Sequence, residues 1–302
     1  MLFKSNGKIL LTSEYLVLDG AKSIALPSKL TQDLYVSNCD KKITEWESYD
    51  DNDNLWYEEK FYLEKGQLNY YGVKNEISEK MLLLFNHIST TKSLTDILGN
   101  KFTSKLNFKR EWGLGTSSTF INNLAKWANI DPYKLLFSAF NGSGYDIACC
   151  DVNNPIIFQK CDGELKLKNI NFNPPFINNI YLVHLGKKQN TQNAIKNYLN
   201  IKSEKNQLIE RVNLITERIL ECTNLDSFEY LITEHESIIS KAISTEQIHK
   251  AYFSDYKTGK IKSLGSWGGD FILVTSKNND LSYFRNKGYS TIFKLSDLVY
   301  ID

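Results

Sequence analysis

The sequence predicts an α+β fold in two domains, because strand-like segments come first along the chain and helix-like segments cluster after them. Its 302 residues, 42% of them hydrophobic, suffice for one large core or for two packed domains. The polar, proline-bearing stretch 171–175 is the predicted boundary. It gives an N-terminal domain over residues 1–172 and a C-terminal domain over residues 173–302.

Strands are expected where short apolar runs alternate with polar residues or end at turn-forming residues. Asp19 and Gly20 stand between the first two runs, and an Asp-Gly pair favours the positive φ of a tight hairpin turn. A polar loop at 50–54 is expected to join two exposed strands within 45–66. The other expected strands are residues 9–17, 23–26, 34–36, 105–110, 156–158, 165–167, 180–185, 271–275 and 291–294.

Helices are expected where apolar residues recur every three or four positions. Asp131 followed by Pro132 is a favourable helix start, with Asp as the N-cap and Pro in the first turn. His235 falls on the apolar face of a later helix, where a packed core residue is a more ordinary outcome than a metal ligand. The expected helices are residues 77–87, 117–128, 132–140, 191–199, 208–219, 228–238 and 281–287.

Charge and cysteine content limit the classes of partner. The 36 Lys and Arg residues balance 35 Asp and Glu residues for a net charge of +1, so no bulk attraction to nucleic acid or to an anionic membrane is expected. The five cysteines are odd in number and show no CxxC spacing, which favours reduced thiols in a cytoplasmic protein. No apolar run approaches the roughly 18 residues of a membrane span, and the N-terminus has no signal-peptide pattern.

The clearest chemical signal is a glycine turn between a predicted strand and a predicted helix, residues 112–119, WGLGTSST. Glycines let a backbone approach a ligand closely, and the following helix adds unpaired N–H groups and the positive end of its dipole. The hydroxyls of Thr116, Ser117 and Ser118 can cap the helix, bind phosphate oxygens or ligate Mg²⁺. The same residues also fit an ordinary helix cap, and the segment is neither a Walker loop nor a Rossmann fingerprint.

Three further segments carry weaker signals. The loop 141–148, NGSGYDIA, places Asp146 after two glycines, where a carboxylate can orient a hydroxyl, accept its proton, or form an Asx-type turn. The segment 263–270, SLGSWGGD, precedes an apolar strand and marks either close approach to a ligand or a simple turn. Lys8 stands at the start of an apolar strand, where it can contact phosphate, tune an Asp, or keep its head in solvent.

Taken in chain order, these four segments resemble the motifs of the GHMP kinase superfamily, which includes galactokinase, homoserine kinase, mevalonate kinase and phosphomevalonate kinase. Residues 7–15, GKILLTSEY, resemble its opening Gly-Lys segment, and residues 113–118 resemble its phosphate loop, Pro-x3-Gly-Leu-Gly-Ser-Ser-Ala. Residues 142–146 resemble its Ser-Gly-hydrophobic-Asp loop, and residues 265–270 resemble its third glycine turn. The spelling GYDIA at 144–148 also fits a bacterial branch of the family.

The resemblance implies a fold and a set of roles. It implies an N-terminal domain like the second domain of ribosomal protein S5, a C-terminal α+β GHMP domain, and an active site between them for ATP and a small-molecule substrate. Asp146 would be the catalytic base or hydroxyl orienter, Lys8 would lie near it and the transferred phosphoryl group, and Ser117 would ligate Mg²⁺. The other implied contacts are ATP at Gly113, Leu114, Gly115, Thr116, Ser117 and Ser118, and substrate at Glu14, Tyr15, Gly144, Gly265, Gly268 and Gly269.

The chain departs from the family pattern at several positions. The phosphate loop lacks the leading proline, and Ser13 and Tyr15 replace the usual Gly and His. The segment 133–141 contains no acid, whereas mevalonate kinases carry a Glu there that helps to hold Mg²⁺. The second protein ligand of the metal is therefore open, although ATP oxygens and water supply most Mg²⁺ ligands in such sites.

The resemblance is nearest to mevalonate kinase and phosphomevalonate kinase, which implies an acceptor from isoprenoid precursor synthesis. Lys187 and Lys188 are candidates for contact with an acidic substrate, but a solvated loop pair is the more ordinary explanation. Two other functions are open. One is a ligand sensor or interaction protein without catalysis, which the missing acid favours and the presence of Lys8 and Asp146 opposes. The other is a decarboxylase that phosphorylates its substrate transiently, as the diphosphomevalonate enzymes do. The sequence also leaves a homodimer open.

Overall fold

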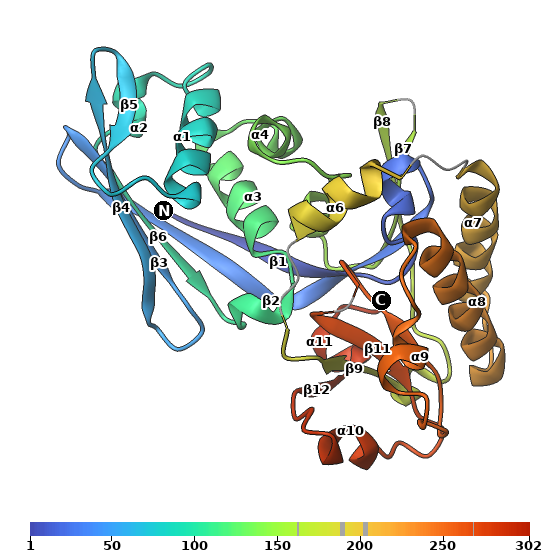
Figure 1. Ribbon diagram of the computed structural model, residues 1–302. Helices are drawn as coiled ribbons and strands as arrows, with labels where there is room; N and C mark the ends of the chain where they lie inside the picture. Colours follow the sequence, from blue (N-terminus) through green and yellow to red (C-terminus); the bar gives the residue numbers. More distant parts are fainter. Residues whose placement is uncertain (162, 188–190, 202–204, 268) are drawn as a thin grey trace. The chain divides into compact units, whose positions relative to one another are not determined.

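The computed structural model describes residues 1–161, 163–187, 191–201, 205–267 and 269–302, and it confirms the α+β class (Figure 1). Contacts within the chain define two compact units. The first unit comprises Met1–Gly7, Leu30–Arg110 and Gly115–Asp151, and the second comprises Lys8–Lys29, Glu111–Leu114 and Val152–Asp302. The chain passes between these units several times, and a single boundary after residue 172 stays a prediction.

A mixed β-sheet with the strand order β5-β4-β3-β6-β2 forms the frame of the first unit. β3 pairs in parallel with β6, and the other neighbours pair antiparallel. β1 pairs with β2, and both strands have residues in each unit. The strands are β1 (Leu2–Leu10), β2 (Ser23–Asn38), β3 (Ile43–Tyr49), β4 (Leu55–Glu64), β5 (Gln67–Tyr70) and β6 (Asn100–Leu106).

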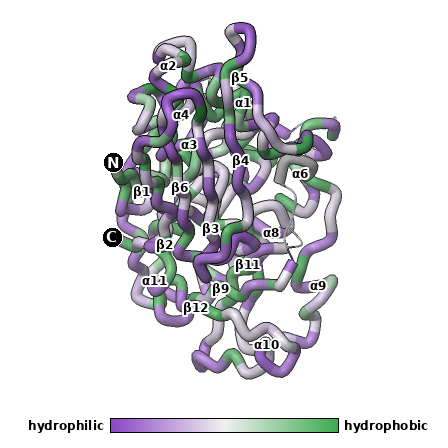
Figure 2. Tube along the Cα trace, turned by 90° about the vertical axis from the view of Figure 1, so that its left-hand side faces the viewer, coloured by the Kyte–Doolittle hydropathy of each residue, from purple (hydrophilic) through white to green (hydrophobic). Residues whose placement is uncertain are grey.

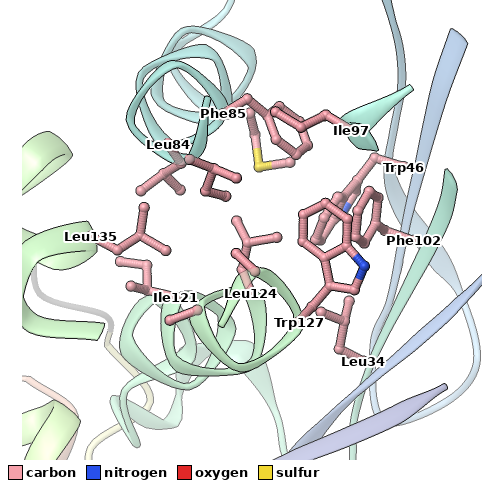
Figure 3. Close-up of a cluster of buried hydrophobic side chains, with 14 of the residues drawn as sticks. Leu34, Trp46, Leu84, Phe85, Ile97, Phe102, Ile121, Leu124, Trp127 and Leu135 are labelled. Carbon is pink, nitrogen blue, oxygen red and sulfur yellow. The ribbon is translucent and has the colours of Figure 1, made fainter. Parts of the chain in front are cut away.

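Helices pack their apolar faces onto one side of this sheet. Figure 3 shows Phe85 of one helix and Leu124 of another pointing toward the aromatic residues of the strands. Trp46 of β3 stacks on Phe102 of β6 at 5.0 Å between ring centroids, and Trp127 meets Phe102 edge-on at 4.8 Å. The helices are α1 (Glu76–Ile88), α2 (Leu94–Ile97), α3 (Thr116–Ala128), α4 (Pro132–Ala139) and α5 (Tyr145–Cys149).

An antiparallel sheet with the order β10-β11-β9-β12 lies at the centre of the second unit. Every residue of β9 and β11 is buried, and their apolar character can be followed in Figure 2. A separate hairpin, β7 and β8, pairs with residues 23–25 of β2. The strands are β7 (Ile156–Cys161), β8 (Glu164–Asn169), β9 (Ile180–His184), β10 (Ile261–Ser263), β11 (Phe271–Thr275) and β12 (Ile292–Lys294).

The helices of the second unit follow the predicted amphipathic pattern. Val212 and Ile215 of one helix and Phe228 and Ile238 of the next are buried. Asn224 caps the latter helix by accepting a hydrogen bond from the Ser227 N–H at 2.9 Å. The helices are α6 (Thr191–Leu199), α7 (Asn206–Leu220), α8 (Leu225–Ile243), α9 (Ile248–Tyr252), α10 (Ser282–Asn286) and α11 (Leu295–Leu298). Short 3-10 helices are η1 (Leu16–Asp19), η2 (Arg110–Trp112) and η3 (Ile177–Asn179).

Most predicted elements are confirmed, and the errors have local causes. The predicted strand 9–17 is wrong, because β1 ends at Leu10 and η1 follows. Gly20 does adopt the predicted positive φ, +93°, but it ends η1 rather than turning a tight hairpin. The predicted strand 105–110 ends at Leu106, because the Thr31 N–H donates to the Asn107 side chain at 2.7 Å instead of to its backbone carbonyl.

Two further features concern the cysteines and the length of the apolar helices. All five cysteines are free thiols. Within the described ranges, no helix is both long and apolar enough to cross a bilayer.

Candidate active site

The glycine turn 113–115 leads into an α-helix whose N-terminal end is open. Gly113 and Gly115 have φ values of +68° and +90°, a region that glycine reaches without strain. α3 begins at Thr116, and no side chain in the described part of the chain caps it. Its first N–H groups can therefore bind an anion, which the helix dipole also favours. Ser117 is exposed in this first turn, whereas Ser118 is buried.

Buried polar side chains fix α3 against the sheet of the first unit. Thr119 donates a hydrogen bond to the Gln32 side chain, and the Asn123 amide donates to the Gln32 carbonyl at 2.8 Å. Ser5 donates to Asn123 at 2.8 Å, and Asn122 donates to Ser5 at 2.9 Å. Apolar periodicity does not predict this network, because its members satisfy one another inside the core. It fixes the direction of the helix that starts at the glycine turn.

Lys8 lies near the end of β1 and binds the glycine turn. Its backbone N–H donates to the Leu114 carbonyl at 3.0 Å, and its ammonium group donates to the Gly113 carbonyl, also at 3.0 Å. The half-buried side chain is thus directed to the backbone of the turn rather than to open solvent. A fixed ammonium group there adds positive potential beside the turn.

The carboxylate of Asp270 occupies the space beside Gly113. A Cβ built on Gly113 would lie 2.5 Å from both Cγ and Oδ2 of Asp270, closer than non-bonded atoms approach. Position 113 therefore requires glycine for two reasons, its positive φ and the approach of Asp270. Both residues belong to the second unit, so this contact joins the first glycine turn to the end of the third glycine segment.

We expect Gly113→Ala to lower the free energy of unfolding by about 2–4 kcal/mol, the sum of left-handed strain and overpacking. Gly265→Ala is the matched control, because Gly265 has a φ of +57° but no atom within 4 Å of a Cβ placed there. It should lose only about 1 kcal/mol. Urea unfolding of both variants measures the difference, and equal losses would show that Asp270 does not crowd position 113.

The second glycine loop leads into α5. Gly144 has a φ of +94°, and a Cβ there would lie 3.1 Å from the ring of Tyr133. Asp146 is half-buried in the first turn of α5, where the helix dipole favours a negative charge. The loop and the first turn of α5 thus fix the backbone position of Asp146. The catalytic role of its carboxylate stays a prediction.

The opening motif forms a strained turn after β1. Ser13 and Tyr15 have φ values of +66° and +63°, which side-chain-bearing residues rarely adopt. Glycine reaches this region without strain, so the Ser13 backbone is strained here. The Tyr15 hydroxyl donates to the Ser266 carbonyl at 2.7 Å and so binds the turn to the third glycine segment. Burial, with the nearby charges of Glu14 and Asp270, raises the pKa of Tyr15 above its ordinary value, so the phenol stays protonated.

A buried charge cluster lies beneath this turn. Glu14 and Lys262 form an ion pair, and both side chains are fully buried. Lys262 also donates to the Ser263 carbonyl at 2.8 Å. His235 accepts the Ser13 N–H at 2.7 Å through Nε2, which lies 3.6 Å from Glu14 Oε2. Burial lowers the pKa of His235 well below its ordinary value, as a nitrogen that accepts a hydrogen bond requires.

Glu14 itself is shifted by this environment. Burial raises the pKa of Glu14 from 4.5 to about 7, against the opposing attraction of Lys262. His235 lies in the core, as its place on an apolar helix face predicts, whereas the burial of Lys262 is not expected from the sequence. The one available signal was a lysine inside the short apolar run before the third glycine segment, and a three-residue strand is too short to show a pattern.

The third glycine segment contains several left-handed residues. Gly265 has a φ of +57°, and the side-chain-bearing residues Trp267 and Asp270 have φ values of +55° and +52°. Gly269 is buried, and Gly268 lies outside the described residues. Of the lysine pair predicted for an acidic substrate, Lys187 is described and exposed, while Lys188 also lies outside the described residues.

The predicted site residues divide between the two units. Within the second unit, contacts join Lys8 to Gly113, Tyr15 to Ser266, and Gly113 to Asp270. The members in the second unit are Lys8, Glu14, Tyr15, Gly113, Leu114, Gly265 and Gly269, and those in the first are Gly115, Thr116, Ser117, Ser118, Gly144 and Asp146.

A hydroxyl in the first turn of α3 has the chemistry of a metal ligand. The exposed Ser117 side chain could ligate a divalent cation whose other ligands came from water or from a bound anion. Among the described residues, no group of three or more His, Cys, Asp or Glu side chains could hold a metal. α4 carries no acid.

Fold and site together define an α+β protein with a glycine turn at an uncapped helix N-terminus. No sequence-family profile matches the chain. No characterised protein sequence matches it either. Solved structures, in contrast, align with this chain along nearly its whole length.

The fold is shared with solved structures of small-molecule kinases. Mevalonate kinase of Methanococcus jannaschii aligns over 97% of this chain and 96% of its own, with a TM-score of 0.66 and 14% identity. Phosphomevalonate kinase of Streptococcus pneumoniae, solved with phosphomevalonate and AMPPNP, aligns over 98% of this chain and 100% of its own. The TM-score is 0.68 and the identity is 13%. Galactokinase of Lactococcus lactis, solved with galactose, aligns over 99% of this chain and 93% of its own, with a TM-score of 0.69 and 12% identity. The resemblance predicted from the motifs is thus confirmed at the level of the fold.

Proposed function

We propose that this protein is an ATP-dependent kinase that transfers the γ-phosphoryl group to a hydroxyl or phosphate of a small metabolite. The observation that carries the proposal is the glycine turn 113–115, which opens an uncapped helix and holds the Lys8 ammonium group on its backbone. It belongs to a fold shared with kinases of small molecules.

The proposed chemistry needs positioning and charge neutralisation more than covalent participation. Bound Mg²⁺ supplies part of that neutralisation. N–H groups at the start of α3 would bind phosphate oxygens, the Ser117 hydroxyl would ligate the metal, and Lys8 would add positive potential. Asp146 would orient the acceptor hydroxyl or take its proton, a contribution of about 10²–10⁴-fold.

The proposed acceptor is mevalonate or phosphomevalonate. The motif resemblance supports this branch, and kinases of both compounds share the fold. Tyr15 and Gly265 are half-buried and remain candidates for substrate contact. Glu14 is fully buried and paired with Lys262, so we propose that it acts on the substrate site through the Tyr15 turn.

The test is release of ADP from Mg-ATP in the presence of mevalonate, phosphomevalonate, homoserine or galactose, with binding of ATP measured in parallel by calorimetry. Turnover on one acceptor supports the kinase and identifies its branch. Release of CO₂ together with ADP would identify the decarboxylase alternative. Binding of ATP without turnover would favour a sensor, and failure to bind ATP would refute the proposal.

A further inference from the structure

The start of the glycine turn is attached to the second unit at consecutive residues. Residues 111–114 all belong to this unit. The N–H and the ammonium group of Lys8 donate to the carbonyls of Leu114 and Gly113, each at 3.0 Å. The segment 105–119 contains no proline, so none of its residues fixes the backbone by itself. The turn thus depends on contacts with other elements for a fixed position.

Trp112, the residue before the turn, packs edge-on against two aromatic rings of the second sheet. Its ring centroid lies 5.2 Å from that of Phe293 on β12 and 6.0 Å from that of Phe271 on β11, at interplanar angles of 71° and 67°. Phe271 and Phe293 contact each other at 6.1 Å in the same manner. Edge-on contact is a preferred arrangement of aromatic rings, and three rings in mutual contact restrict one another. The Trp112 side chain therefore has a fixed place on the sheet.

His184 of β9, the strand between β11 and β12, holds the residue before Trp112. Its Nδ1 accepts the Gly186 N–H at 3.2 Å, and its Nε2 lies 3.1 Å from the Glu111 carbonyl oxygen. A backbone N–H can only donate, so this pattern assigns the proton of the neutral ring to Nε2, which donates to the Glu111 carbonyl. The buried His184 ring also packs edge-on against Phe271 at 5.1 Å.

We propose that Trp112 and His184 are positioning residues for nucleotide binding. They hold the backbone of the turn at Gly113, and with it the bound ammonium group of Lys8, before the nucleotide arrives. A flexible glycine turn loses conformational entropy when it binds a ligand, and a turn that is already fixed loses less. The inference rests on the proposed ATP-binding function and assigns a role to two residues outside the predicted set of site residues.

Ordinary core packing is the competing explanation for both residues. Tyr289→Ala is the matched control, because Tyr289 is also half-buried in the second unit and packs edge-on against Phe253 at 5.6 Å. Trp112→Ala removes the ring contacts beside the turn, and Trp112→Phe restores an aromatic ring there. His184→Phe keeps a ring at its position and removes its hydrogen bonds.

Two measurements on the full chain separate positioning from packing. The first is hydrogen exchange by mass spectrometry over residues 110–118 without nucleotide, and the second is calorimetric titration with Mg-AMPPNP. We expect Trp112→Ala to exchange about tenfold faster over this segment and to bind Mg-AMPPNP about tenfold more weakly than the wild-type protein. Trp112→Phe should recover most of both quantities, and His184→Phe should shift both in the direction of Trp112→Ala. Tyr289→Ala should match the wild-type protein in both.

The exchange rate of the turn tests the inference independently of nucleotide. Unchanged exchange over residues 110–118 in Trp112→Ala overturns the inference, and so does faster exchange with unchanged affinity for Mg-AMPPNP. Equal effects in Trp112→Ala and Tyr289→Ala show ordinary core packing and overturn it as well. These three outcomes leave the proposed kinase standing.

Absence of Mg-AMPPNP binding by the wild-type protein overturns the proposed function, and with it the role in nucleotide binding, while the exchange rates still decide whether the two residues fix the turn. If Trp112→Ala fails to fold, His184→Phe, the smaller change, takes its place in both measurements. Wild-type exchange and affinity in His184→Phe then overturn the inference.

Discussion

Asp146→Asn is expected to lower turnover by about 10²–10⁴-fold while leaving the affinity for ATP close to that of the wild-type protein. The asparagine keeps the size of the side chain and loses the carboxylate that would orient the acceptor hydroxyl or take its proton. Asp146 is half-buried in the first turn of α5, so the substitution should change the stability of the fold little. Steady-state ADP release and ATP calorimetry measure the two quantities separately.

Asp151→Asn is the matched control for this prediction. Asp151 follows α5, pairs with Lys126 and accepts a hydrogen bond from Asn122 at 3.1 Å. Its role is structural, and we expect turnover near the wild-type level with a loss of stability of about 0–1 kcal/mol. If Asp146→Asn retained full turnover, the carboxylate would not take part in the reaction, and positioning alone would explain catalysis.

Lys262→Met is expected to destabilise the protein by about 3–5 kcal/mol near neutral pH, because the fully buried Glu14 must then either stay charged without its cation or hold a proton that the unfolded chain releases. The double variant Glu14→Gln with Lys262→Met removes both charges and should recover much of the loss. Urea unfolding of the wild-type protein, the single variant and the double variant measures their free energies of unfolding.

Lys105→Met tests whether the effect comes from burial. Lys105 pairs with Asp53 at 2.6 Å, but both side chains are largely exposed, at 46% and 69%. Such a pair contributes about 0–1 kcal/mol, so this variant should remain close to wild type. A similar loss in Lys262→Met and Lys105→Met would contradict the assignment of a buried ion pair.

The stability of the cluster should also depend on pH through Glu14. Its pKa is 4.5 when unfolded and about 7 in the folded chain, where burial disfavours the charged form. At pH values between 4.5 and about 7, Glu14 keeps its proton in the folded chain and has released it in the unfolded chain. The contribution of Glu14 to the free energy of unfolding is therefore fully present below pH 4.5 and falls as the pH rises through about 7. Glu14→Gln cannot ionise, and unfolding curves of this variant should lack that part of the pH dependence. An identical pH dependence in both proteins would contradict the shifted pKa.

Local chemistry explains why much of the fold could be predicted. The apolar periodicity of α1 and α3, the Asp131 cap of α4 and the buried run of β11 act over a few neighbouring residues, and the structure places each nearly where the sequence does. Glycine at 113 and 115 likewise follows from the backbone of a single turn. Spacing and residue type thus determined the α+β class, most helices and strands, and the phosphate-turn candidate.

Only the tertiary structure decided how distant residues meet. The Glu14–Lys262 pair joins residues 248 positions apart, and the Tyr15–Ser266 hydrogen bond joins residues 251 positions apart. The contact between Gly113 and Asp270 is of the same kind, since each residue alone resembles an ordinary turn residue. Burial and electrostatic pairing depend on the packed environment, and a window of neighbouring residues does not contain it. The sequence by itself determined the class and the glycine turns of this protein, and the folded chain decided which charges lie beside them.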